Sequence, residues 1–187
     1  MEVLKTESDK ILISSDRVMH VKCEIDGRIC KIPEYISKFF HKTSFMYIST
    51  INLNGDPQIH PTIFVNEPGK CILSFLINKK AKVLEELVNN PILALTIDEV
   101  DPTNPFVGTG IMIEAKSQHS SSINKIKQCL ERLQNKYDPD VVTKILGIDV
   151  VSKYIKFRAL PIKLVFWKGP FFKKITCKKK KKLLAVS

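Results

Sequence analysis

Short β-like segments divided by turn signals are the feature that most constrains the fold of this chain. Three apolar runs of strand length cover 45–53, 58–65 and 71–77, and Asn54-Gly55 supplies a turn after the first. One amphipathic helix separates the third run from a fourth at 92–97. This order predicts a mainly β protein, an antiparallel barrel with helices at its rim.

The second half of the chain continues the same pattern. The sequence predicts a fifth strand over 107–116 and two late strands, 154–159 and 162–167, joined by a tight Leu160-Pro161 link. Apolar residues at helical spacing predict a helix over 123–137. Shorter helices are predicted over 34–41 and between Asp138-Pro139 and Gly147.

The chain has no internal repeat and no linker, so we expect one domain with decorations. Residues 1–32 are predicted to be an N-terminal extension with a hairpin, 33–172 the barrel domain and 173–187 a lysine-rich tail. The Asp26-Gly27 turn would place Cys23 opposite Cys30, at a separation compatible with a disulfide. In a mesophilic cytosol both would remain thiols, whereas some hyperthermophiles would oxidise them.

Lysines crowd the start of the helix that follows the third strand. Asn78 is a suitable N-cap, and Lys79, Lys80 and Lys82 come before the first acidic residue, Glu85. A helix start carries partial positive charge, so lysines there are unfavourable unless an anion binds among them. The lysines either extend into water at a small cost or, with the free backbone N–H groups, form a phosphate site.

The net charge of +11 is unevenly distributed. Seven lysines and no acid fall within 173–187, and the rest of the chain has 23 basic against 19 acidic residues, or +4. Such a tail is typical of a solvated end, and less often of an arm for nucleic acid or anionic membrane. No apolar run approaches the roughly 20 residues that span a bilayer, and a signal peptide pattern is missing, so we expect a cytoplasmic protein.

Motifs for hydrolytic or nucleotide chemistry are absent from the sequence. The four histidines lie in no H-E-x-x-H motif, and no G-x-S-x-G, P-loop or G-x-G-x-x-G motif occurs. Asp98, Glu99 and Asp101 are more typical of a solvated turn than of a metal site, and we expect no metal. If the protein is an enzyme, its reactive group should arrive with a cofactor.

The order of these parts resembles the flavin-binding split barrel of the pyridoxamine 5′-phosphate oxidase superfamily. The resemblance runs from about Pro33 to Gly169 and rests on three blocks, Ile48–Pro57, Asn78–Pro91 and Pro161–Gly169. It implies an antiparallel six-stranded split β-barrel with Greek-key connections and helices at the rim. It also implies FMN as the cofactor and a homodimer with flavin sites between the subunits.

The resemblance further assigns individual residues to the cofactor. Asn78 matches the family asparagine after the third strand, and Lys82 matches a family arginine. The remaining assignments are His60 in place of another arginine, Thr62 and Ile63 along the flavin ring through their backbone groups, Lys79 and Lys80 as additional phosphate contacts, and Trp167 as the tryptophan that reaches the flavin. No side chain is assigned as a catalytic acid or base.

The sequence also allows other interpretations of these residues. His60 is also compatible with an ordinary strand histidine, and Trp167 with core or dimer packing. The favoured function is an FMN-dependent oxidoreductase acting on a small molecule. The alternatives are a related barrel that uses a deazaflavin or haem, or a non-enzymatic module whose Lys178–Lys182 run contacts nucleic acid or membrane.

One departure from the family limits the expected activity. The pyridoxine-phosphate enzymes follow their tryptophan block with an arginine- and histidine-containing stretch that engages the substrate. Here the continuation, Pro170–Ile175, contains neither residue type. We therefore expect no efficient oxidation of pyridoxamine phosphate.

Overall fold

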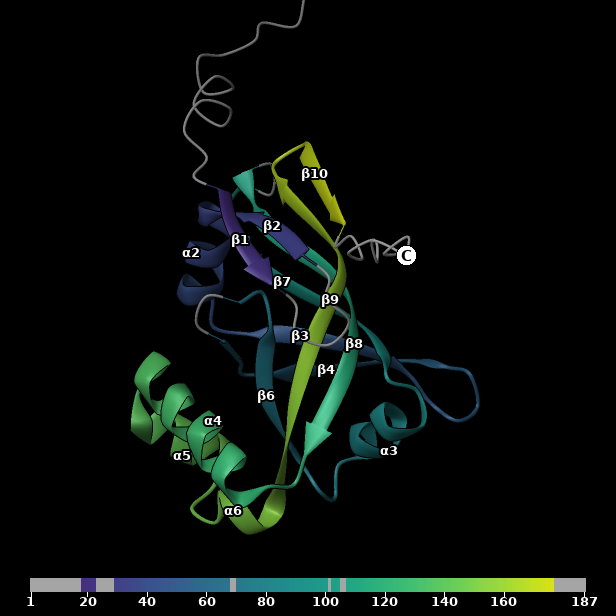
Figure 1. The fold of residues 1–187 in the computed structure, drawn as a ribbon, viewed down its shortest axis with the longest axis vertical. Coiled ribbons are helices and arrows are strands. Elements are labelled where there is room, and N and C mark those ends of the chain that lie inside the picture. The colour runs from purple at the N-terminus through teal and green to yellow at the C-terminus, as the bar shows by residue number, and fades with distance from the viewer. Residues whose placement is uncertain (1–17, 23–28, 68–69, 101, 105–106, 177–187) are drawn as a thin grey trace, which may run out of the picture.

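A curled antiparallel sheet with helices around it forms the body of the protein (Figure 1). This computed structural model describes residues 18–22, 29–67, 70–100, 102–104 and 107–176. The main sheet consists of β3 (Met46–Ile51), β4 (Pro57–Thr62), β5 (Val65–Asn66), β6 (Leu73–Asn78), β7 (Ile92–Glu99), β8 (Thr109–Ser120), β9 (Tyr154–Lys168) and β10 (Phe171–Thr176). The helices are α2 (Glu34–Lys42), α3 (Lys82–Asn89), α4 (Ile123–Lys136), α5 (Pro139–Leu146) and α6 (Val150–Lys153).

The sheet bends until its two edges approach each other. Its strand order is β4-β3-β7-β8-β9-β6-β5, with β10 pairing β9. The two outermost strands of this path, β4 and β5, are consecutive in the chain and only Ile63 and Phe64 lie between them. So short a link forces the ends of the sheet together, which produces a split barrel. The predicted mainly β fold with peripheral helices is confirmed.

The main core fills the concave side of the sheet. Alternate residues of β3 point inward, and Met46 and Ile48 are fully buried there with Phe75 and Phe157. Helix α2 closes one side of this core with its own apolar face, Ile36, Phe39 and Phe40. Tyr35 and Phe39 both contact the ring of Phe166, at centroid distances of 4.8 and 6.3 Å.

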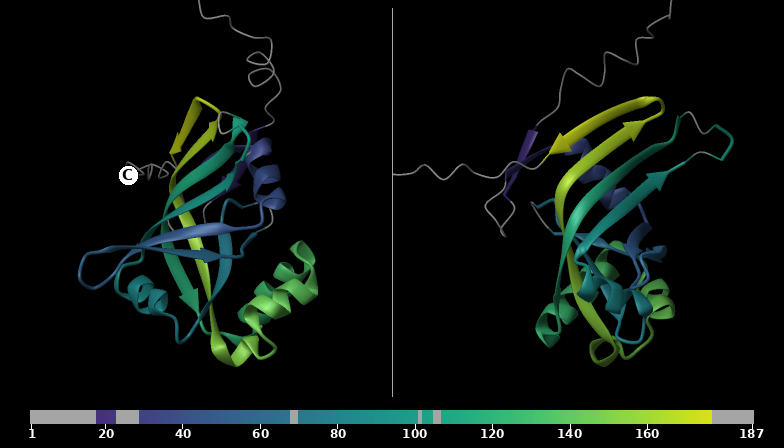
Figure 2. Two further views of the ribbon diagram at one scale, coloured as in Figure 1. Left: turned by 180° about the vertical axis from the view of Figure 1, so that it is seen from behind. Right: turned by 90° about the vertical axis from the view of Figure 1, so that its right-hand side faces the viewer.

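A second apolar cluster lies under α4, α5 and α6. Residues of α4 spaced at three and four, Ile126, Cys129 and Leu133, pack with Ile63 and Leu76 from the sheet. Asp138 caps α5, since its Oδ1 accepts from the N–H groups of Asp140 and Val141. This cluster anchors the three helices on the side of the molecule opposite α3 (Figures 1 and 2).

The late part of the sheet differs from the predicted arrangement. Leu160-Pro161 is not a link, because β9 is one continuous strand from Tyr154 to Lys168. Its register with β8 shifts between Glu114 and Ala115, and the proline sits at this bulge, where a missing N–H is tolerated. The sheet therefore has eight strands rather than six, since β5 and β10 also pair.

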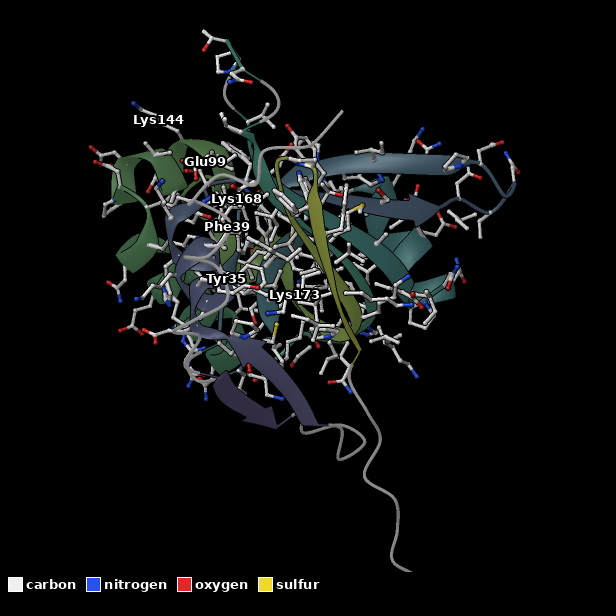
Figure 3. The ribbon with its side chains drawn as sticks, turned by 90° about the horizontal axis from the view of Figure 1, so that it is seen from above. Tyr35, Phe39, Glu99, Lys144, Lys168 and Lys173 are labelled. Atoms are coloured by element: carbon white, nitrogen blue, oxygen red, sulfur yellow. The ribbon has the colours of Figure 1, made fainter. Side chains whose placement is uncertain are left out.

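Strand β10 extends the folded part to Thr176, four residues past the expected boundary at 172. Lys173 of β10 lies over the ring of Tyr35 at 5.7 Å, which connects this strand to α2 (Figure 3). The Lys178–Lys182 run lies outside the described residues. None of the described helices has the length and apolar character needed to cross a membrane.

The N-terminal hairpin has a different register from the predicted one. Strands β1 (Val18–Lys22) and β2 (Ile29–Pro33) pair antiparallel, with Cys30 opposite Val21 rather than Cys23. The register thus differs by two residues from the predicted one, and the Asp26-Gly27 turn lies outside the described residues. Cys23 itself lies outside the described residues, whereas Cys71 and Cys129 are both buried.

Candidate cofactor-binding site

The start of α3 presents backbone N–H groups that no side chain caps. The N-cap is Ala81, which has no side chain able to accept a hydrogen bond. Asn78 is therefore not the N-cap predicted from the sequence. Instead its Oδ1 accepts from the N–H of Lys80 at 2.9 Å and its carbonyl accepts from Ala81, which forms the turn between β6 and α3. The first turn of α3 consequently has donors available for an anion.

The three lysines near this helix start have different environments. Lys80 and Lys82 are exposed, directly before and at the first residue of α3. Lys79 points elsewhere, because its Nζ donates to the carbonyl of Ser152 at 2.6 Å and its N–H to the carbonyl of Lys153. Lys79 thus joins β6 to α6, and Lys80 and Lys82 remain as the cations beside the helix start.

His60 is held by a buried carboxylate that the sequence analysis did not identify. Its Nε2 lies 3.1 Å from Oε2 of Glu86, and the hydroxyl of Thr50 donates to the same oxygen. Only 8% of the Glu86 side chain is exposed. Glu86 is four residues after Lys82 and so shares its helix face one turn further on, a spacing that could have indicated it.

Thr62 and Ile63 lie where β4 ends and the barrel edges meet. The Thr62 hydroxyl donates to the carbonyl of Ile63 at 3.3 Å. The Ile63 side chain is buried in the cluster beneath α4 and α5. Any contact from Ile63 to a flavin ring would therefore come from its backbone, as the resemblance implies.

In the fold, Trp167 lies at the opposite end of β9 from the start of α3. At one end of β9, Tyr154 pairs with Asn78, and Trp167 is thirteen residues further along the same strand. At the rise of an extended strand, this corresponds to about 40 Å of backbone. Its ring covers Gly110, its partner on β8, where a Cβ atom would overlap the indole carbons. His60 therefore contacts α3 through Glu86, and Lys82 begins the same helix, whereas Trp167 lies at the far end of β9.

Among known proteins, solved structures share the fold of this chain. Neither a protein family profile nor a curated protein sequence matches this chain. A Clostridium acetobutylicum protein of the pyridoxinephosphate oxidase family, related to general stress protein 26 of B. subtilis, is 16% identical with a TM-score of 0.58, over 76% of this chain and 92% of its own.

Two further solved structures share the arrangement. HutZ, a heme storage protein from Vibrio cholerae, is 16% identical over 75% of this chain and 91% of its own, with a TM-score of 0.55. An F420 reductase is 15% identical over 68% of this chain and 94% of its own, with a TM-score of 0.53. The resemblance found in the sequence is confirmed at the level of the fold, since the chain has the split-barrel arrangement that these structures share.

Proposed function

We propose that the protein binds FMN, with the flavin phosphate at the start of α3, and acts as a flavin-dependent oxidoreductase on a small molecule. The observation that carries the proposal is the uncapped first turn of α3 with Lys80 and Lys82 beside it. Two ammonium groups and free N–H donors are the groups that bind a phosphate dianion. Bound FMN would supply hydride or electron transfer through its ring.

The residues around this helix start fit a phosphate. Glu86 is the one acidic side chain buried on α3, and its carboxylate oxygen Oε2 already accepts from Thr50 and faces His60. These contacts hold Glu86 against Thr50 of β3 and His60 of β4, on the sheet side of the helix. In this arrangement His60 supports the site by holding Glu86, and Lys80 and Lys82 hold the phosphate.

Trp167 fits the same proposal if the protein is a homodimer. Because Trp167 and Asn78 lie at opposite ends of β9, we do not expect one chain to place both against a single flavin. The outer face of β3, β4, β7 and β8 exposes five large apolar side chains, which are interspersed with polar ones: Tyr47, Ile51, Ile59, Ile92 and Met112. An apolar face of this kind favours a second copy, whose Trp167 would complete the site.

A flavin titration with a phosphate-specific control tests the cofactor. Wild-type protein should bind FMN with a shifted flavin absorbance spectrum, and bind riboflavin more weakly because riboflavin lacks the phosphate. In a Lys80→Gln/Lys82→Gln variant, FMN affinity should fall about tenfold or more, while riboflavin affinity stays unchanged. The matched control, Lys127→Gln/Lys144→Gln, removes two exposed lysines from α4 and α5 and should behave as wild type.

The same titration distinguishes FMN from the ligands of other split barrels. HutZ is a heme storage protein and another neighbour is an F420 reductase, so haemin and a deazaflavin should be titrated in parallel. A colourless protein that refuses FMN to high micromolar concentration would contradict the proposal. If the protein binds haemin or a deazaflavin tightly and does not bind FMN, that ligand and not FMN is the cofactor.

A further inference from the structure

A second cationic site lies on the other side of the sheet from α3. A cavity of about 260 Å³ opens between α4 and the paired ends of β8 and β9. The pairing of Gln118 with Arg158 and of Ser120 with Lys156 forms its floor, and Arg132 of α4 lies in its wall. Helices α3 and α4 lie well apart in the ribbon views, so this cavity is separate from the proposed flavin phosphate site (Figures 1 and 2).

The one acidic residue that lines the cavity, Glu67, has both carboxylate oxygens occupied. Arg158 donates from Nε to Oε1 and from an Nη to Oε2, each at 2.7 Å, and Ser74 donates to Oε1 at 3.0 Å. Burial raises the pKa of Glu67, but Arg158, Ser74 and Lys156 outweigh it and the pKa is lowered overall. Glu67 is thus an ionised acceptor whose hydrogen bonds are made within the protein.

Lys156 is a buried ammonium group that forms an ion pair but, within the described part of the chain, no hydrogen bond. Its side chain is 9% exposed, and Nζ lies 3.7 Å from Oε1 of Glu67, an ion pair too long for a hydrogen bond. Among the residues that the structure describes, no oxygen accepts a hydrogen bond from this ammonium group. A buried ammonium has three donors and a high cost of burial unless they are satisfied, and Lys156 faces the cavity.

The charges in and around the cavity do not balance. Glu67 supplies one negative charge, against the positive charges of Arg158 and Lys156 next to it. Two further cations, Lys125 and Arg132, line the cavity from α4. The neutral side chains of its wall, Gln118, Ser120 and Gln128, all carry hydrogen-bond donors. The lining therefore offers many donors and a net positive charge to whatever occupies the space.

We propose that this cavity binds a small oxyanion, a phosphate group either free or as a compact phosphate monoester. Lys156 holds the anion from the floor, and Arg132 and Lys125 hold it from α4. The volume lies below the range of about 300–1,000 Å³ that is usual for larger organic ligands, which favours a compact anion over a flavin. The site is a second ligand position, separate from the proposed flavin phosphate site.

Calorimetric titration of the full chain with inorganic phosphate, at constant ionic strength, tests the site. Wild-type protein should give saturable binding. Arg132→Gln and Lys156→Met should each weaken it about tenfold or more, since each removes a charged donor. Lys127→Gln is the matched control, because Lys127 is an exposed cation on the same helix but outside the cavity. Phosphate should also raise the melting temperature of wild type but not of Lys156→Met, and a cooperative melt of that variant shows that it is folded.

Two further titrations identify the source of the phosphate and locate its site. Glycerol phosphate binding more tightly than inorganic phosphate would support a monoester, whereas equal affinities would support free phosphate. The Lys80→Gln/Lys82→Gln variant should keep the phosphate binding of this cavity, because neither lysine lines it, and should lose only phosphate that wild type binds at the start of α3. The proposal is overturned if no saturable binding occurs up to about 10 mM, if Lys127→Gln weakens binding as much as Arg132→Gln, or if the Lys80→Gln/Lys82→Gln variant loses it.

Discussion

At the scale of single residues, Gly110 is required by the ring that covers it. Trp167 is the partner of Gly110 across β8 and β9, and its indole occupies the space of a Cβ atom at that position. No other side chain fits without moving this ring. Because the chain has one tryptophan, tryptophan fluorescence reports on the surroundings of this ring.

A Gly110→Ala variant should therefore displace Trp167. We expect a shifted emission spectrum and a loss of stability of about 1–3 kcal/mol, the usual cost of forcing extra volume into a packed contact. Fluorescence and denaturant unfolding measure the two effects. Glu114→Ala, an exposed position on the same strand, should change neither. An unchanged spectrum in Gly110→Ala would show that the ring does not lie over the glycine.

Glu86 is a residue whose charge opposes a phosphate at the helix start. Glu86→Gln keeps the shape of the side chain and removes its negative charge, so FMN should bind severalfold more tightly. Glu85→Gln changes the net charge equally but lies at an exposed position of α3, and it should have the smaller effect. FMN titrations of both variants measure the difference. Equal effects would mean that only the overall charge of the protein matters.

At the scale of elements, Lys136 connects α4 to two other parts of the fold. Its Nζ donates to the carbonyl of Phe40 in α2 at 2.8 Å and to that of Phe64 at 3.2 Å, and it lies 3.7 Å from the centre of the Phe64 ring. One side chain thus satisfies backbone carbonyls at the end of α2 and at the β4–β5 link. Burial lowers the pKa of Lys136 to about 7.

This lowered pKa predicts a pH-dependent stability. Between about pH 7 and the ordinary lysine value of 10.5, the unfolded chain binds a proton that the folded chain has released, so this group makes the free energy of unfolding rise with pH. Partial exposure keeps the slope below the roughly 1.4 kcal/mol per pH unit of one fully transferred proton.

Denaturant unfolding across this pH range, compared between wild type and Lys136→Met, measures the contribution. The difference in unfolding free energy between the two proteins should increase with pH above 7. Lys127→Met, an exposed position on α4, should run parallel to wild type. A constant difference between wild type and Lys136→Met across the range would show that this lysine keeps its proton in the folded state.

At the scale of the whole molecule, local signals predicted the elements better than the contacts between them. The Asn54-Gly55 turn and the helix before Pro91 are local features, and they predicted the succession of strands and helices along the chain. The continuity of β9 through Pro161 depends on a bulge against β8, which only the paired strands reveal. The position of Glu86 against His60 likewise depends on how α3 packs on the sheet.

The residues that line the proposed oxyanion-binding cavity could not be predicted together from the sequence. Its lining comes from the end of β5, the end of β8, the start of β9 and helix α4, which are distant in the chain. No spacing in the sequence joins Glu67 to Arg158, and their ion pair exists because β5, β6 and β9 pair side by side. Residues assembled by sheet pairing therefore escape motif-based prediction even where the strands themselves are predicted.

The exposed apolar face of the sheet predicts the assembly state of the whole protein. Tyr47, Ile59 and Met112 lie on this face, and a second copy covering it would remove their apolar surface from water. Wild type should therefore have twice the chain mass in light scattering or sedimentation. Ile59→Lys, on edge strand β4, should shift it toward the monomer and weaken FMN binding with it, since Trp167 of the second copy is then lost. Ile148→Lys, at a position 94% exposed outside this face, should leave both properties unchanged. A wild-type protein that is monomeric at micromolar concentration and still binds FMN would show that one chain completes the flavin site without Trp167.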